Sequence, residues 1–232
     1  TGAGNTALGR DALYANTTAA NNTGVGYNAL AANTTGTGHT AVGHGAGYSG
    51  TTGDYNTIVG SSAMYNVTTG YRNTAIGREA GANITTGYYN VCVGFDAKPT
   101  SATTNGEFTL GNTSISNLRC NDTSISSLSD ARDKKDIVDL SYGLDFINET
   151  RPVTFKWETR DGNVKDGQTH NGFIAQELLA LGSNEQHRLV LEENPDRLEA
   201  SYGNLLPMMV KAIQELSTKN DALEARITAL EA

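Results

Sequence analysis

One spacing dominates this chain, because glycine recurs every 17 residues over its first hundred positions. Six glycines follow this spacing, at positions 9, 26, 43, 60, 77 and 94. A branched aliphatic residue precedes each of them, alanine follows three positions later, and a Thr-Thr pair recurs in the repeats. Such a fixed period is typical of a solenoid in which each repeat forms one coil. The glycine content disfavours helix, so we expect short strands such as 73–76 joined by Gly and Asn turns.

The repeat also predicts that one chain has a thin interior. The consensus gives each coil one aliphatic side chain and one or two alanines, which is little apolar surface. Ordering the 17 residues of a coil costs about 1 to 2 kcal/mol of backbone entropy each. Several chains around a common axis would share their aliphatic columns, and a trimer is the natural arrangement for a fibrous β-solenoid. The sequence starts within a repeat, which predicts that the polypeptide continues upstream.

The charged residues are divided unevenly, and this favours two domains. Residues 1–100 carry four basic and four acidic side chains, whereas residues 129–232 carry 12 and 19. An acidic chain without a basic stripe is unsuited to nucleic acid, and no run of 18 apolar residues predicts membrane insertion. The two cysteines and four histidines lack metal-ligand spacing, so we expect neither a metal nor a cofactor. Cys92 falls in a column of small apolar residues and is expected to be buried.

The repeat itself resembles a known one. The stretches NTALGRDAL at 5–13 and NTAIGREAG at 73–81 are similar to head repeats of trimeric autotransporter adhesins and to repeats of many phage tail fibres. The resemblance covers residues 1 to about 97 and implies a trimeric parallel β-roll.

A second resemblance covers the C-terminal half. Its stretches are SDARDKK from 129, RPVTFKW from 151, HNGFIAQEL from 170 and YGNLLPMMVKAIQEL from 202. Alternation predicts a strand in the second and a strand running into a helix in the third. Together they resemble the C-terminal intramolecular chaperone domain of phage tailspikes and fibres, the peptidase S74 domain.

The predicted fold is therefore a mainly β repeat shaft followed by an α+β chaperone domain that ends in a trimeric coiled coil. We expect a solenoid shaft over 1–97 and a β connector over 98–128, in which the 17-residue register is lost. A self-cleaving chaperone domain over 129–204 and a coiled-coil helix over 205–232 follow.

The chaperone resemblance implies a single self-cleavage at the Leu128–Ser129 bond. In the matching motif Ser129 is the nucleophile and Lys134 is its base. A lysine removes a hydroxyl proton at neutral pH only when burial or positive neighbours lower its pKa. No activity on outside substrates is implied.

The same residues also fit an ordinary helix start, with Ser129 as N-cap and Asp130 in the first turn. In the catalytic interpretation Arg132 and Lys135 supply positive charge, and Asp130 has at most a positioning role. Residues five apart on a helix point away from each other. Ser129 therefore meets Lys134 only if the serine precedes the helix, or if the lysine comes from a neighbouring chain.

The last helix carries heptad spacing, which predicts a trimerisation seam. A polar asparagine occupies one seam position, where such a residue usually fixes register and strand number. The seam residues are Met209, Ile213, Leu216, Asn220, Leu223, Ile227 and Leu230.

These patterns predict the C-terminal part of a homotrimeric phage tail fibre, assembled in the host cytoplasm and carried on the virion. Its expected partners are tail proteins upstream and a glycan or protein receptor on the host surface. One alternative is a structural adhesin or fibre shaft whose end trimerises but never cleaves. A glycan-degrading tailspike is a third reading, although four acidic residues in the shaft offer little for paired carboxylates. The shaft tyrosines either stack on sugars or pack partly buried, and His170 either lies near the cleavage site or makes a structural hydrogen bond.

Overall fold

The computed structural model describes residues 2–115, 118–119, 121, 129–158, 167–182, 187–192, 194, 196 and 198–231. The chain forms two compact units, Thr1–Leu118 and Arg119–Ala232, and each is treated by itself below. Leu128, on the amino side of the expected cleavage site, and Cys120 lie outside the described residues.

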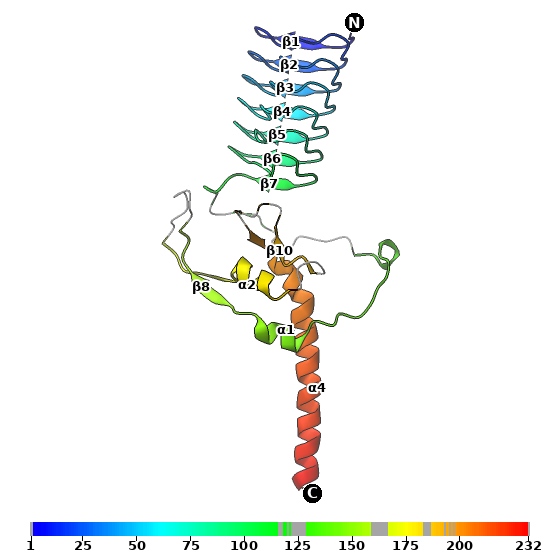
Figure 1. Cartoon of the computed structure of the whole chain (residues 1–232), viewed down its shortest axis with the longest axis vertical. Coiled ribbons are helices and arrows are strands. Elements are labelled where there is room, and N and C mark those ends of the chain that lie inside the picture. Colours follow the sequence, from blue (N-terminus) through cyan, green and yellow to red (C-terminus); the bar gives the residue numbers. More distant parts are fainter. Residues whose placement is uncertain are drawn as a thin grey trace. The chain divides into compact units, whose positions relative to one another are not determined.

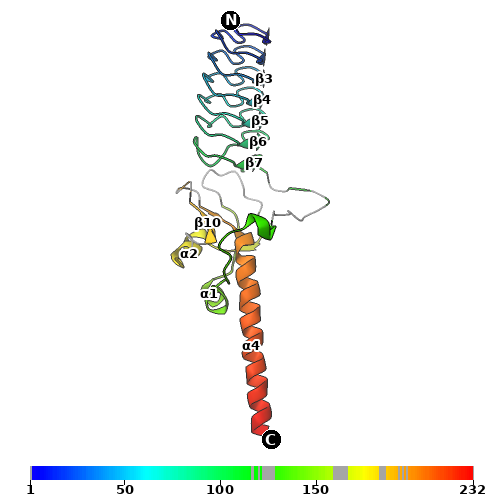
Figure 2. The same ribbon diagram turned by 90° about the vertical axis from the view of Figure 1, so that its right-hand side faces the viewer.

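The first unit is a parallel β-solenoid, as the glycine spacing predicts. Each coil contributes one three-residue strand, and each strand pairs in parallel with the next, so that Thr6 lies opposite Thr23 and Ala75 opposite Cys92. Figures 1 and 2 show the strands of this unit stacked one above another. The strands are β1 (Thr6–Leu8), β2 (Thr23–Val25), β3 (Thr40–Val42), β4 (Thr57–Val59), β5 (Thr74–Ile76), β6 (Val91–Val93) and β7 (Phe108–Leu110).

The seventh strand corrects one prediction. The 17-residue register does not end after residue 97, because β7 pairs with β6 and places Phe108 opposite Val91. Gly111 then occupies the glycine column, while Ser114 stands where the alanine is expected. Backbone pairing needs the strand and its glycine but not the alanine, so the expected connector begins as a further coil of the shaft.

The strict glycine column has a steric cause. These glycines have φ between +117° and +138°, which L side chains rarely adopt. A Cβ placed on Gly60 would lie 2.3 Å from the carbonyl oxygen of Gly77 in the next coil. At Gly9, Gly26, Gly43 and Gly77 the corresponding distance is 2.4 to 2.7 Å, so these turns require glycine.

The interior of the shaft differs from the prediction in which side chains fill it. The aliphatic residues before the column glycines face outward, with Leu8 66% and Ile76 44% exposed. Buried instead are the column alanines, together with larger side chains that the consensus leaves variable. The buried apolar cluster comprises Leu13, Leu30, Ala41, Ala46, Ile58, Ala63, Met64, Val67, Ala75, Ala80, Ile84, Cys92 and Ala97.

The thin-interior prediction is therefore wrong in detail, because large and small residues alternate between coils. Leu30 and Met64 occupy the position four after their column glycines, and Gly47 occupies it in the coil between them. A Cβ on Gly47 would lie 2.7 Å from Ile58 Cδ1 and 3.0 Å from Leu30 Cδ2. One coil thus leaves the space that its neighbours fill, and this complementarity is invisible in a consensus.

A buried polar ladder runs along the same unit. The side-chain oxygen of Asn56 accepts a hydrogen bond from the backbone N–H of Asn73 at 2.9 Å, and Asn73 does the same for Asn90. Each amide also donates to a carbonyl 14 residues on, as Asn73 does to Gly87 at 2.8 Å. His39 replaces asparagine in one coil, where its Nδ1 accepts from the N–H of Asn56 at 3.2 Å. The ladder satisfies backbone groups that the coil turns would otherwise leave unpaired.

The second unit is a small α+β assembly around one long helix. Its strands form two antiparallel pairs, β8 (Val153–Phe155) with β9 (His170–Gly172) and β10 (Val190–Leu191) with β11 (Glu199–Ala200). Its helices are α1 (Leu144–Glu149), α2 (Ala175–Ala180) and α4 (Leu206–Glu231), with 3₁₀ turns η1 (Ala131–Asp133) and η2 (Tyr202–Leu205). The predicted strand at 151–157, the strand-to-helix segment at 170 and the final helix are all confirmed.

Six buried side chains form the core of this unit, namely Phe146, Leu178, Leu189, Val190, Leu205 and Met208. They bring α1, α2, β10 and the start of α4 together. The Glu215 carboxylate of α4 accepts a hydrogen bond from the N–H of Leu144 at 2.8 Å and so caps the amino end of α1. Figures 1 and 2 show α1 beside the first half of α4.

Candidate active site

The segment from Ser129 to Lys134 forms a short capped turn. Asp130 has extended backbone geometry and accepts a hydrogen bond from the backbone N–H of Arg132 at 2.9 Å, so it is the N-cap of η1. The turn ends at once, because Lys134 is again extended, with φ −114° and ψ 145°. A helix start is therefore present, but Asp130 and not Ser129 caps it.

This turn brings Ser129 and Lys134 together within one chain. The Nζ of Lys134 donates a hydrogen bond to the Oγ of Ser129 at 2.7 Å. Ser129 precedes the turn and Lys134 follows it, which is the first of the two arrangements the sequence left open. A hydroxyl and an amine in hydrogen-bond contact are the pair that a serine nucleophile with a lysine base requires. No further chain is needed to form the contact.

The charges around the pair differ in arrangement from the expectation. Arg132 was expected to supply positive charge, yet its guanidinium holds Asp130, with Nε 3.0 Å from Oδ1 and Nη2 2.6 Å from Oδ2. The side-chain hydrogen bond from Arg132 is the main cause that lowers the pKa of Asp130. Arg132 is therefore largely neutralised by its partner, and Lys135 remains as the adjacent cation.

Ser129, Lys134 and Lys135 are all exposed in the single chain. A lysine becomes a base at neutral pH through desolvation or nearby positive charge. The chain alone supplies no burial at this site, although it supplies the contact. Among the described residues, Ser129 and Lys134 thus form an exposed hydrogen-bonded pair of a hydroxyl and an amine.

His170 lies elsewhere in the unit, on β9 of the β8–β9 pair. Its ring stacks on Phe155 with 5.9 Å between centroids, and Trp157 lies edge-on at 6.4 Å. The structure thus gives His170 an aromatic packing environment on the hairpin.

The helix α4 leaves its heptad seam uncovered. Only Met208 and Ala212 of this helix are buried, and every residue from 216 to 231 is exposed. A helix of 26 residues is about 39 Å long, and most of that length has no packing partner within the chain. The seam residues Ile213, Leu216 and Ile227 are 65%, 55% and 54% exposed.

Within the described ranges, no group of three or more His, Cys, Asp or Glu side chains is placed to hold a metal ion. Among the helices described, none is both long and apolar enough to cross a membrane. Cys92 is buried as predicted, and burial is the main cause that raises the pKa of its thiol to about 11.

Comparison with known proteins finds a family match within the second unit. Residues 129–186 match the Peptidase S74 family, described as the chaperone of endosialidase. Together with the parallel solenoid before it, this match confirms the resemblance to a chaperone-terminated fibre. The search of curated proteins and the search of solved structures found no match to this chain. The family match begins at Ser129, for which the sequence predicts the role of nucleophile.

Proposed function

We propose that this chain is the C-terminal part of a homotrimeric phage tail fibre whose chaperone domain assembles the trimer and then cuts itself off at the Leu128–Ser129 bond. The observation that carries the proposal is that both units leave a mainly apolar column of side chains exposed or half-buried. In the shaft this column consists of the residues before the glycines, and in α4 it is the heptad seam. Chaperone domains of this family act in trimer assembly, and three copies would cover both columns.

The order of assembly follows from the need for a common register. Each coil pairs with the next coil of its own chain, so contacts between chains would form only where the aliphatic columns of the shafts meet. Repeats of equal length allow those columns to meet in several registers, and misaligned assembly is the expected failure. The heptad seam of α4 carries one polar residue, Asn220, which favours a single register. Trimerisation at the carboxyl end would therefore align the three chains before their shafts associate.

In the proposed cleavage, Ser129 is the nucleophile and Lys134 transfers the proton. Lys134, once neutral, takes the hydroxyl proton of Ser129, whose Oγ then attacks the carbonyl carbon of residue 128. Because the nucleophile follows the scissile bond directly, this attack closes a five-membered ring. The lysine returns its proton to the Ser129 nitrogen, the C–N bond breaks, and an ester remains. The Ser129 nitrogen is then a free amine, and water hydrolyses the ester to a carboxylate at Leu128 and the regenerated hydroxyl of Ser129.

Assembly supplies what the isolated site lacks. Ser129 and Lys134 are exposed in the single chain, so burial against neighbouring chains would desolvate the amine and favour its neutral form. Cleavage would then wait for the trimer. The mature shaft would travel on the virion with the tail proteins upstream, and it would meet a glycan or protein receptor on the host surface.

A denaturing gel of the expressed chain tests the proposal. We expect fragments of 128 and 104 residues from the wild type, and an intact chain from Ser129→Ala and from Lys134→Ala. Asp136→Ala, a nearby exposed substitution outside the turn, serves as the control that still cleaves. An intact wild-type chain that forms trimers would instead indicate the non-cleaving fibre or adhesin.

Mixed trimers test whether the pair acts within one chain. The observed Lys134–Ser129 contact lies within one chain, so a mixture of Ser129→Ala and Lys134→Ala chains should give no cut product. Cut product from that mixture would show that the lysine serves a neighbouring chain.

A further inference from the structure

One column on the shaft carries tyrosine in three coils and is interrupted at a coil between them. The position five after each column glycine holds Tyr14, Ala31, Tyr48 and Tyr65 in successive coils. The rings of Tyr48 and Tyr65 stack, with centroids 4.9 Å apart and planes 9° from parallel. Tyr14 has no such neighbour at Ala31, and it is 79% exposed.

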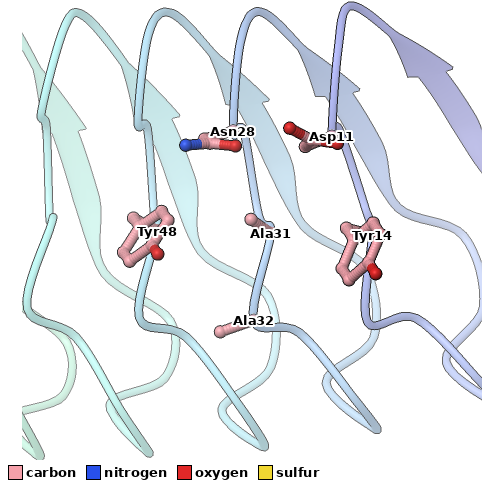
Figure 3. Close-up of a pocket in the computed structure, with 6 residues that line it drawn as sticks. All are labelled: Asp11, Tyr14, Asn28, Ala31, Ala32 and Tyr48. Carbon is pink, nitrogen blue, oxygen red and sulfur yellow. The ribbon is translucent and has the colours of Figure 1, made fainter.

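The missing ring leaves an open slot. Figure 3 shows Tyr14 and Tyr48 on the two coils that flank the coil bearing Ala31 and Ala32. The slot has a volume of about 370 Å³, within the range of small-molecule sites, about 300 to 1,000 Å³. Its walls are two coil steps apart, about 10 Å by the spacing of stacked strands. One ring fits where the absent tyrosine would stand.

Polar groups line one end of the slot. Asp11 and Asn28 lie there, as Figure 3 shows, each on a left-handed turn with φ 59° and 58°. The Oδ2 of Asp11 accepts a hydrogen bond from Arg10 Nε at 2.9 Å, which fixes the carboxylate and leaves its other oxygen to accept. Two aromatic walls, a small apolar floor and a carboxylate beside an amide thus converge on one space.

We infer that this slot binds one hexopyranose ring of a saccharide. The C–H faces of a pyranose suit aromatic walls, and its hydroxyls pair with carboxylate and amide groups. A nucleobase would also stack, but the first hundred residues carry only four basic side chains to hold its phosphates. A purely apolar ring would leave the polar end unpaired. The inference deepens the receptor-binding part of the proposed function and rests on it.

The slot remains accessible in a trimer that forms through the aliphatic column. That column lies on the strands, at the position before each glycine, whereas the slot lies on the segments that follow the strands. Figure 3 shows the strands behind the segments that carry Tyr14 and Tyr48.

Ala31→Tyr is the decisive variant, because tyrosine already occupies this position in three other coils. The new ring would complete the stack and fill the slot. Ala82→Tyr is the matched control, since it adds a tyrosine in the same column outside the slot. Tyr14→Ala removes one wall at an exposed site and provides a second variant should Ala31→Tyr not fold.

The experiment is saturation-transfer NMR on the assembled protein with glucose, galactose, mannose and N-acetylglucosamine, and with phenol as the apolar ring. We expect at least one hexopyranose to bind to the wild type and to Ala82→Tyr. Binding should weaken about tenfold or more in Ala31→Tyr and in Tyr14→Ala, as for the loss of an aromatic stacking partner.

Three outcomes overturn the inference: no sugar binds, phenol alone binds, or binding persists unchanged in both variants. Trimer mass and self-cleavage are recorded on the same samples. A trimer that cleaves but binds no sugar would contradict saccharide binding at the slot and would still support the assembly proposal. A chain that binds sugar but neither trimerises nor cleaves would contradict the assembly proposal and would still support saccharide binding at the slot.

Discussion

The two units differ in where their packing contacts lie. In the shaft the contacts run along the whole stack of coils, whereas in the second unit they are concentrated around the start of α4. Each shaft coil is completed by its neighbours, through the asparagine ladder and through alternating large and small interior residues. The chaperone unit has a small core around the start of α4, and beyond it the helix runs with every side chain exposed. Yet both units leave one apolar column uncovered. Under the proposed function, the equal repeats of the shaft do not specify a register between chains, and the heptad seam of α4 would specify it.

The largest expected effect comes from the seam of α4. Leu223→Asp places a charge in the predicted trimer interface, whereas Ala222→Asp places the same charge one residue away, outside the seam. We expect the first variant to lose the trimer and the folded shaft together, because register is no longer set. The second variant should assemble normally. Sedimentation velocity and circular dichroism measure both properties, and a trimeric Leu223→Asp would show that α4 does not direct assembly.

The ladder of the shaft is expected to give the next largest effect. Asn73→Ala leaves the N–H of Asn90 and the carbonyl of Gly87 without their partners in a buried setting. Each unsatisfied group costs about 1 to 3 kcal/mol, so the free energy of unfolding should fall by about 2 to 6 kcal/mol. Asn66→Ala, which removes an exposed hydrogen bond to Ala82, should cost less than about 1 kcal/mol. Urea unfolding of the trimer compares the two, and equal losses would contradict a structural ladder.

His39 makes the ladder sensitive to acid. Burial is the main cause that lowers its pKa below 6.5, although the Gly53 carbonyl, the Asp54 carboxylate and Asn56 act in the opposite direction. The unfolded chain therefore binds the proton more readily than the folded one. The stability contributed by neutral His39 is present above pH 6.5 and is lost as the pH falls through the lower folded value.

His39→Asn restores the residue used in the other coils and should remove this part of the pH dependence. Urea unfolding at several pH values between 7 and about 5 measures it. The same slope in both proteins would show that His39 does not titrate with folding.

Cys92 is expected to give the smallest effect. Its column holds alanine in several coils, so Cys92→Ala should change the free energy of unfolding by about 1 kcal/mol or less. Because its thiol has a pKa of about 11 and is buried, alkylation by iodoacetamide at pH 8 should be slow until the shaft unfolds. Mass spectrometry of the Cys92 peptide follows the reaction, and fast labelling of the native protein would contradict the buried position.

The features that follow from the repeat or from a short sequence motif could be predicted from the sequence. The glycine spacing gave the parallel strands and their register, and the segments from 151 and 170 gave β8, β9 and α2. The pairing of Ser129 with Lys134 was open between two arrangements, because a five-residue separation excludes contact on a helix but not around a short turn. Their catalytic roles stay a prediction, as do those of Asp130, Arg132 and Lys135.

Other features depend on differences between repeats, which a consensus removes. The interior leucines and methionine lie at a position that glycine occupies in two other coils, and the seventh coil lacks the consensus alanine. Likewise, the slot beside Ala31 exists because one coil lacks the tyrosine of its neighbours. Aligning each column separately, and asking which coil departs from it, would have located both.

The central claim is that this fold is completed by three chains. Light scattering of the uncleaved Ser129→Ala chain tests it most directly, because both units remain joined. The account predicts a single species with the mass of three chains that stays assembled as the protein is diluted to low concentration. A well-folded, heat-resistant species with the mass of one chain would contradict it.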